Sequence, residues 1–235
     1  MSFNMCMANN TFKRFKFSIL RSILAIFLSL IALENNLNAQ KRNRFTGMLE
    51  YKVSLRDSLM KDLISDNTMV IYTNDTIVRV ENQTDQLGKQ VVIRHMEKNK
   101  SYLLLDTQIG KFAIQTDHSI RDTVIVESKY DFKNKLCRTK ILGKKANCVV
   151  ASHPSFEEPI EFLYFKDISN KYNNIFESIN GLPVKYSIPS ADGILDYELV
   201  RINEFLPERD MFGIPSDYER LSFDDFLDKM LAPKE

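Results

Sequence analysis

The sequence predicts a mainly β protein of the α+β class, in which an antiparallel meander is covered by helices. Many short stretches are rich in β-branched and aromatic residues, and polar or glycine-containing gaps separate them. Two of these stretches are apolar on both faces, and two later stretches carry apolar residues at helical spacing. Strands that are apolar on both faces need a cover on each face, and helices can supply one of the two covers.

The first 39 residues are predicted to be a secretory signal peptide. Four basic residues between positions 13 and 21 precede an apolar run over residues 23–33, and Ala39 suits cleavage before Gln40. The apolar run is well short of the ~20 residues that span a bilayer. Cys6 lies too far from the cleavage point to become a lipidated first residue. We therefore expect a periplasmic or secreted chain, residues 40–235, with no membrane span after cleavage.

The mature chain is close to neutral and long enough for one domain. Cleavage removes four basic residues and Glu34, which leaves 28 Lys and Arg against 30 Asp and Glu. Nucleic-acid binding needs a basic stripe that faces phosphates, so we expect no nucleic-acid partner. No linker, repeat or low-complexity stretch divides residues 40–235. A single domain is expected.

The predicted strands follow one another at short intervals. Residues 68–73 and 76–81 flank Asn74-Asp75, a pair that tolerates the positive φ of a tight hairpin turn. Further strands are expected at residues 90–96, 101–107, 111–116, 123–130, 139–151, 160–166, 184–188 and 194–205. This spacing indicates an antiparallel meander.

Two predicted strands are apolar on both faces. In residues 102–105, Leu103 and Leu105 point to one face while Tyr102 and Leu104 point to the other. The stretch Phe-Leu-Tyr-Phe at 162–165 behaves alike. Helices would cover one face, and sheet curvature, a further segment or a ligand would cover the other. A closed barrel packed with its own side chains is the alternative.

Two helices are predicted. Residues 168–179 carry an apolar stripe, and Gly181 and Pro183 follow where a helix would end. The stripe consists of Tyr172, Ile175, Phe176 and Ile179. Residues 222–231 form the second pattern, in which Ser222 and Asp225 resemble a capping box. Its apolar face consists of Phe223, Phe226, Leu227 and Met230.

Four short motifs occur in order along the mature chain: GMLEY at 47–51, ILG at 141–143, GLP at 181–183 and FGIPSDY at 212–218. They resemble the GLPGLI-type and related secreted proteins of gram-negative bacteria, which are grouped with the lipoprotein-carrier (LolA/LolB-like) superfamily. This chain reads Gly-Leu-Pro-Val-Lys-Tyr where the name-giving motif reads Gly-Leu-Pro-Gly-Leu-Ile, which suggests a sister family. The resemblance implies a strongly curved antiparallel half-barrel with helices packed in its open side. It implies no catalytic residues.

Residues that could carry chemistry are sparse. The three histidines are scattered: His95, His118 and His153. With no paired cysteine motif, we expect no metal site and no cofactor. Cys148 and His153 could act as nucleophile and base, but a strand cysteine followed by a loop histidine is the favoured interpretation. The adjacent carboxylates at 157–158 and 224–225 point in different directions on a strand or a helix, so neither pair forms a catalytic dyad. We therefore expect that the protein is not an enzyme.

These observations favour a non-catalytic carrier or sensor that holds an acyl chain or another apolar ligand between the concave sheet and its helices. The alternative is a cell-envelope interaction protein with a fully packed interior, whose surface or sheet edge binds another protein. The residues expected to line the ligand cavity and its mouth are Leu103, Leu105, Phe162, Tyr164, Phe212 and Tyr218.

Cys137 and Cys148 would enter an oxidising compartment together. If the chain turns at residues 142–143, position 137 lies opposite 148, within reach of a disulfide. If residues 139–151 form one strand kinked at Gly143, the two sulfurs lie far apart. The sequence leaves both alternatives open.

Overall fold

The computed structural model describes residues 44–56, 67–84, 88–107, 110–117, 127, 129–190 and 193–231. These residues belong to one compact unit, Arg44–Glu235. The predicted signal peptide lies outside the described residues, as does most of the strand predicted at 123–130.

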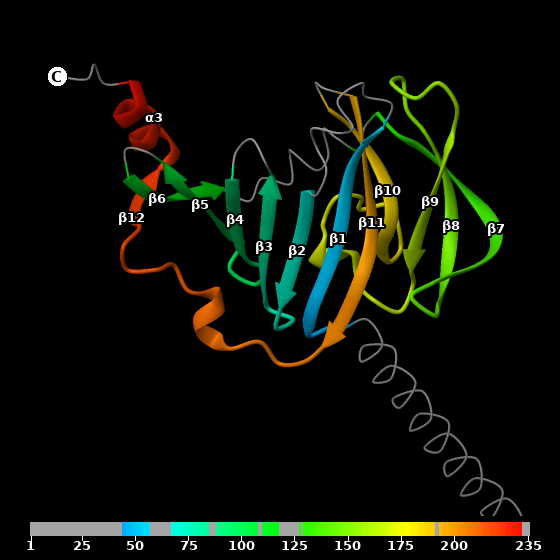
Figure 1. Cartoon of the computed structure of the whole chain (residues 1–235), viewed down its shortest axis with the longest axis horizontal. Coiled ribbons are helices and arrows are strands. Elements are labelled where there is room, and N and C mark those ends of the chain that lie inside the picture. The colour runs from blue at the N-terminus through cyan, green and yellow to red at the C-terminus, as the bar shows by residue number, and fades with distance from the viewer. Residues whose placement is uncertain are drawn as a thin grey trace, which may run out of the picture. The chain divides into compact units, whose positions relative to one another are not determined.

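Within this part of the chain, twelve strands form one open sheet in the order β12-β6-β5-β4-β3-β2-β1-β11-β10-β9-β8-β7 (Figure 1). Their bounds are β1 Gly47–Arg56, β2 Asn67–Thr73, β3 Ile77–Thr84, β4 Gly88–His95, β5 Lys100–Thr107, β6 Gly110–Asp117, β7 Asp131–Ile141, β8 Lys144–Ser152, β9 Ile160–Phe165, β10 Leu182–Ser190, β11 Gly193–Glu204 and β12 Glu219–Ser222. The pairs are antiparallel except β6 with β12. The predicted meander is confirmed from β2 to β6 and from β8 to β11. The sequence predicted neither β7, which pairs with β8, nor β1, which joins the two halves by pairing with β2 and β11.

The predicted α+β class, with helices packed in the open side of a half-barrel, is wrong. Among the described residues, no helix lies in the open side of the sheet. The short helix α3, Phe223–Leu231, packs at the sheet edge against β6 and β12. The helix predicted at 168–179 is reduced to a single 3-10 turn, η2, Asn170–Tyr172.

Asparagine side chains explain the missing helix. The Asn170 side-chain amide donates to the carbonyls of Phe176, Glu177 and Ile179 at 3.1–3.3 Å, and Asn174 has a positive φ of 51°. Asparagine competes in this way with helical hydrogen bonds. The apolar stripe is still buried, because Tyr172 and Phe176 are fully enclosed. The helical spacing therefore predicted burial correctly here, and the helix itself wrongly.

The helix predicted at 222–231 is confirmed as α3. Its first turn is capped by Ser222, whose Oγ accepts from the Asp225 amide at 3.1 Å and donates to the Asp225 carboxylate at 2.6 Å. The Phe226 ring lies 5.5 Å from the Phe112 ring of β6. The helix thus covers the β6 end of one sheet face, while Phe223 stays 53% exposed.

The main core lies on what we call the inner face of the sheet, the face that carries Leu49, Ile71 and Val80. Toward β9 and β10 this face is filled by aromatic rings in tilted and edge-on contacts, because Phe176 lies 5.5 Å from Phe162 and 5.9 Å from Tyr186. The packed interior considered from the sequence is therefore realised in this half of the sheet.

A smaller core lies on the opposite, outer face of β4, β5 and β6. Val91, Ile93, Leu104 and Ala113 form it. The chain leaving β11 passes along β1–β3 to reach the far edge at β12, through the 3-10 turn η3, Arg209–Phe212 (Figure 1). Ile214 and Tyr218 from this connection are among the residues that cover the smaller core.

Gly181 does not end a helix, contrary to the interpretation of its position in the sequence. Its φ of 148° and its closeness to β9 both require glycine, since an added Cβ would lie 2.2 Å from the Phe165 carbonyl oxygen. The residue lets the chain enter β10 tightly against β9.

Candidate functional site

The structure does not bring the six predicted cavity residues together. Phe162 is fully buried in the main core, with Tyr164 packed against that core, and six strands separate β9 from β5 in the sheet order. Tyr218 covers the smaller core on the outer face, and Phe212 is buried in η3. The remaining two, Leu103 and Leu105, lie together on the inner face of β5, and both are half-buried.

Leu103 and Leu105 belong to a set of side chains that we call the apolar row. Val80 pairs with Val92, Val92 with Leu103, and Leu103 with Ile114 across β3, β4, β5 and β6. The row consists of Val80, Val92, Leu103, Leu105, Phe112 and Ile114. In the described part of the chain, neither core cluster includes Val92, Leu103 or Leu105. The sheet therefore presents incompletely covered apolar side chains on the same face as its main core.

A buried polar pair, Arg94 and Ser101, ends this row. The two residues are direct cross-strand partners, one pleat beyond the pair of Val92 and Leu103, so they share the inner face. Arg94 is 8% exposed and Ser101 3%. One Arg94 nitrogen, Nη2, donates to the Tyr172 carbonyl at 2.7 Å. Arg94 Nε and Ser101 Oγ are buried with no hydrogen-bond partner among the described residues.

Burial lowers the pKa of Arg94 to about 10. No carboxylate among the described residues contacts the guanidinium, although Arg94 remains charged at neutral pH. A buried cation without a counter-ion carries a desolvation cost of several kcal/mol. Arg94 is therefore an electrostatic exception within an apolar face.

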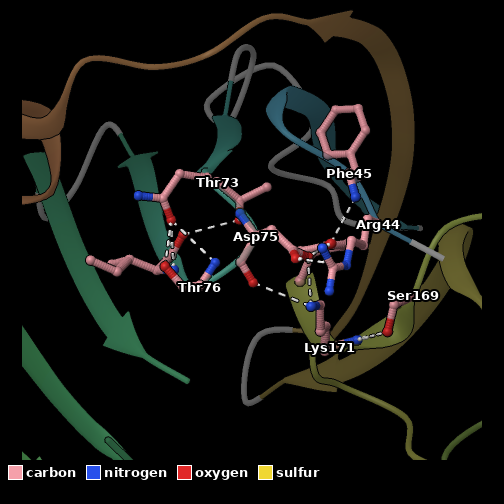
Figure 2. A network of polar contacts seen from close by, with 10 residues as sticks. Arg44, Phe45, Thr73, Asp75, Thr76, Ser169 and Lys171 are labelled. Atoms are coloured by element: carbon pink, nitrogen blue, oxygen red, sulfur yellow. Dashed lines mark hydrogen bonds and ion pairs between the residues drawn. The ribbon is translucent and has the colours of Figure 1, made fainter. Parts of the chain in front are cut away.

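A carboxylate that lies close to Tyr172, Asp75, is already held in a network of polar contacts, shown in Figure 2. Asp75, at the β2–β3 turn, accepts from Lys171 Nζ at 2.6 Å and from the Tyr172 hydroxyl, and Arg44 Nε lies 3.4 Å away. The same Tyr172 hydroxyl accepts from the Phe45 amide at 2.7 Å. Burial opposes ionisation of Asp75 most strongly, but its hydrogen bonds and neighbouring cations outweigh burial and hold its pKa below the usual range. This network fixes η2 over the hairpin.

Two surface hollows lie elsewhere, with volumes of about 770 and 660 Å³. The first, on the outer face beside β12, is lined by Tyr102, Ala113, Gln115, Arg220, Leu221, Ser222, Phe223 and Asp224. The second is lined by Arg56, Ser155, Phe156, Glu157, Glu158, Pro159, Ile160, Gly193 and Ile194. None of the six predicted cavity residues lines either hollow.

Among the described residues, the histidines contact aromatic rings and a backbone amide. His153 Nδ1 accepts from the Ser155 amide at 3.0 Å, and its ring packs 4.7 Å from Tyr130. His95 packs edge-on against Tyr102, and His118 lies outside the described residues. Across the described ranges, no three His, Cys, Asp or Glu side chains gather as a metal site would require. In the same ranges, no helix is long and apolar enough to cross a membrane.

Cys137 and Cys148 form a disulfide, with their Cα atoms 5.9 Å apart. The hairpin alternative is therefore the one realised, with a two-residue turn at Leu142 and Gly143, both of which have positive φ. The predicted direct pairing of 137 with 148 is wrong, because Cys148 pairs with Lys135 and the register shifts between Lys135 and Thr139, so Cys137 lies in a bulge of the edge strand β7. The bond also removes Cys148 as a nucleophile for His153.

Sequence reasoning missed Arg94 and Ser101. Their one signal was parity, because Arg94 alternates with Val92, and Ser101 with Leu103, on strands that were correctly predicted. A charged residue at an inward position of an apolar strand marks either the end of the strand or a buried polar site. Only the hydrogen bond from Arg94 to the Tyr172 carbonyl shows that this position is a buried polar site.

No protein-family model matches the sequence, and no curated protein matches it. Among solved structures, the chain is similar to a crystal structure of a protein named PNGF-II, with 16% sequence identity and a TM-score of 0.47. The similarity covers 79% of this chain and 33% of PNGF-II, so this chain spans about a third of that protein's length. A likeness at this level assigns neither family nor function, and the resemblance to the lipoprotein-carrier superfamily stays a prediction.

Proposed function

We propose that this protein is an exported, non-catalytic binding protein that holds an apolar or amphipathic ligand against the inner face of β3–β6. The observation that carries the proposal is the apolar row, where Val92, Leu103 and Leu105 are half-buried beside two fully buried side chains, Phe112 and Ile114. Completing the burial of a leucine side chain stabilises a complex by up to about 1.5–3 kcal/mol. A ligand that covers several of these side chains gains affinity in the same way.

A periplasmic or secreted location is part of the proposal. The Cys137–Cys148 disulfide supports it, because such bonds persist in oxidising compartments and are rare in the cytosol. The predicted signal peptide supports it independently.

Binding of an uncharged apolar dye, N-phenyl-1-naphthylamine, tests the proposal by fluorescence titration. Leu105→Trp fills the inner face, whereas Asp106→Trp adds the same ring one residue away on the exposed opposite side. We expect Leu105→Trp to weaken dye binding at least about tenfold and Asp106→Trp to leave it unchanged, because an incompletely covered face accepts a larger side chain at little cost. Equal dye affinity in both variants and the wild type, or destabilisation by Leu105→Trp without loss of binding, would contradict the proposal.

One observation favours a second candidate function, binding of a protein partner at the β7 edge. Leu136 is fully exposed in the bulge of this edge strand. In the described part of the chain, β7 pairs with β8 along one edge and has no neighbouring strand along its other edge. Exposed edges can accept a further strand from another chain. Leu136→Asp would then abolish partner binding and leave dye binding intact, whereas the carrier function predicts no effect of this change on ligand binding.

A further inference from the structure

We infer that Arg94 and Ser101 bind the head group of the ligand, and that the ligand is a carboxylate-bearing amphiphile such as a long-chain fatty acid. This inference rests on the proposed function, because it assigns the charged end of a ligand whose apolar part lies along the apolar row.

Arg94 and Ser101 have unused hydrogen-bonding capacity. Arg94 Nε and Ser101 Oγ are both buried without a partner among the described residues. An unpaired buried polar group costs about 1–3 kcal/mol, and native proteins leave few of them. Here two occur on directly paired residues, 8% and 3% exposed. Two unpaired polar atoms on directly paired residues point to one shared partner.

The positive charge of Arg94 calls for a negatively charged partner. Arg94 is a cation that no carboxylate of the described residues contacts, and Asp75 is already held by Lys171, Tyr172 and Arg44. The missing partner is therefore an anion. A carboxylate has two oxygens, which match one guanidinium N–H and one hydroxyl donor, and such charge-assisted hydrogen bonds are stronger than neutral ones.

Arg94 and Ser101 lie at one end of the apolar row. Ser101, Leu103 and Leu105 share one face of β5, so a ligand anchored at Ser101 meets Leu103 and Leu105 in turn. At ~3.3 Å per residue, the distance from Ser101 to Leu105 is about 13 Å. The Tyr172 carbonyl already accepts from Arg94 Nη2, so Nε is the guanidinium nitrogen without a partner on this face.

The test compares two ligands with the same chain, dodecanoate and 1-dodecanol, by isothermal titration calorimetry on the mature protein. We expect the wild type to bind dodecanoate about 10- to 100-fold more tightly, which corresponds to hydrogen bonds with a charged group. Arg94→Met should abolish this preference and leave dodecanol affinity unchanged. Arg201→Met, which removes a largely exposed arginine from the same sheet, serves as the control and should preserve the preference.

Ser101→Ala keeps the test decisive if Arg94→Met does not fold, because it removes an unpaired hydroxyl and should not destabilise the protein. We expect this variant to bind dodecanoate about 3- to 10-fold more weakly and dodecanol as before. Equal wild-type affinities for the two ligands, or a preference that survives in both variants, would overturn the inference while the proposed function stands. Binding of neither ligand by the wild type would overturn both.

Discussion

Reduction of the Cys137–Cys148 disulfide should destabilise the protein by a predictable amount. The bond closes a loop between residues 11 apart in the sequence. The chain-entropy relation for a loop of this length gives about 2.8 kcal/mol of stabilisation at 25 °C. For a domain of this size, about 2.8 kcal/mol corresponds to a decrease in Tm of roughly 6–11 °C. The loss should be nearly independent of packing, because reduction leaves Cys148 in the core, where it is 2% exposed.

Urea unfolding of the mature protein with and without reductant measures this difference. The variant carrying Cys137→Ala and Cys148→Ala provides the control, because its stability should not respond to reductant. Alanine at position 148 adds a small cavity, so this variant should be somewhat less stable than the reduced wild type. If oxidised and reduced wild type unfold at the same urea concentration, the β7–β8 hairpin does not depend on the bond and the reasoning fails.

Three further predictions concern the fold and export. Gly181→Ala should lower the free energy of unfolding in urea by at least about 2–3 kcal/mol, because the alanine Cβ would collide with the Phe165 carbonyl at a φ unsuited to alanine. A loss below about 0.5 kcal/mol, which is typical of surface substitutions, would refute the required contact. The pKa of Asp75 is lowered in the folded protein, so its contribution to stability is present above the unfolded pKa of about 4 and is lost as pH falls through the folded pKa. Asp75→Asn should therefore lower stability at pH 7 and make stability less dependent on pH in the acid range. An unchanged dependence of stability on pH would contradict this prediction. N-terminal sequencing of the protein from its native host should start at or close to Gln40, and retention of residues 1–30 in a membrane fraction would disprove cleavage.

The strands were predictable because their signals are local. Alternating β-branched and aromatic residues with polar turn residues placed β2 to β6 and β9 to β11 within a few residues of their observed bounds, whereas the strand predicted at 139–151 takes in the end of β7, the turn and most of β8. The helix at 168–179 was not predictable from spacing, because Asn170 diverts carbonyls that a helix would use. Apolar spacing reports burial, and local polar side chains decide the backbone conformation that delivers it.

The candidate site was less predictable than the fold. Leu103 and Leu105 were placed correctly on one face, since parity along a strand follows from sequence. Phe162 and Tyr164 were assigned to the same cavity because the sequence does not reveal that six strands separate β5 from β9. Arg94 and Ser101 gained meaning only through the long-range contact with Tyr172, which no local pattern encodes.

Binding of a ligand to the inner face of β3–β6 can be observed residue by residue in methyl NMR spectra of leucine-labelled protein titrated with dodecanoate. We expect shifts and intermolecular contacts at the methyl groups of Leu103 and Leu105, and none at the exposed Leu136 and Leu206. Shifts confined to the exposed leucines, or no shift at Leu103 and Leu105 at saturating dodecanoate, would contradict it.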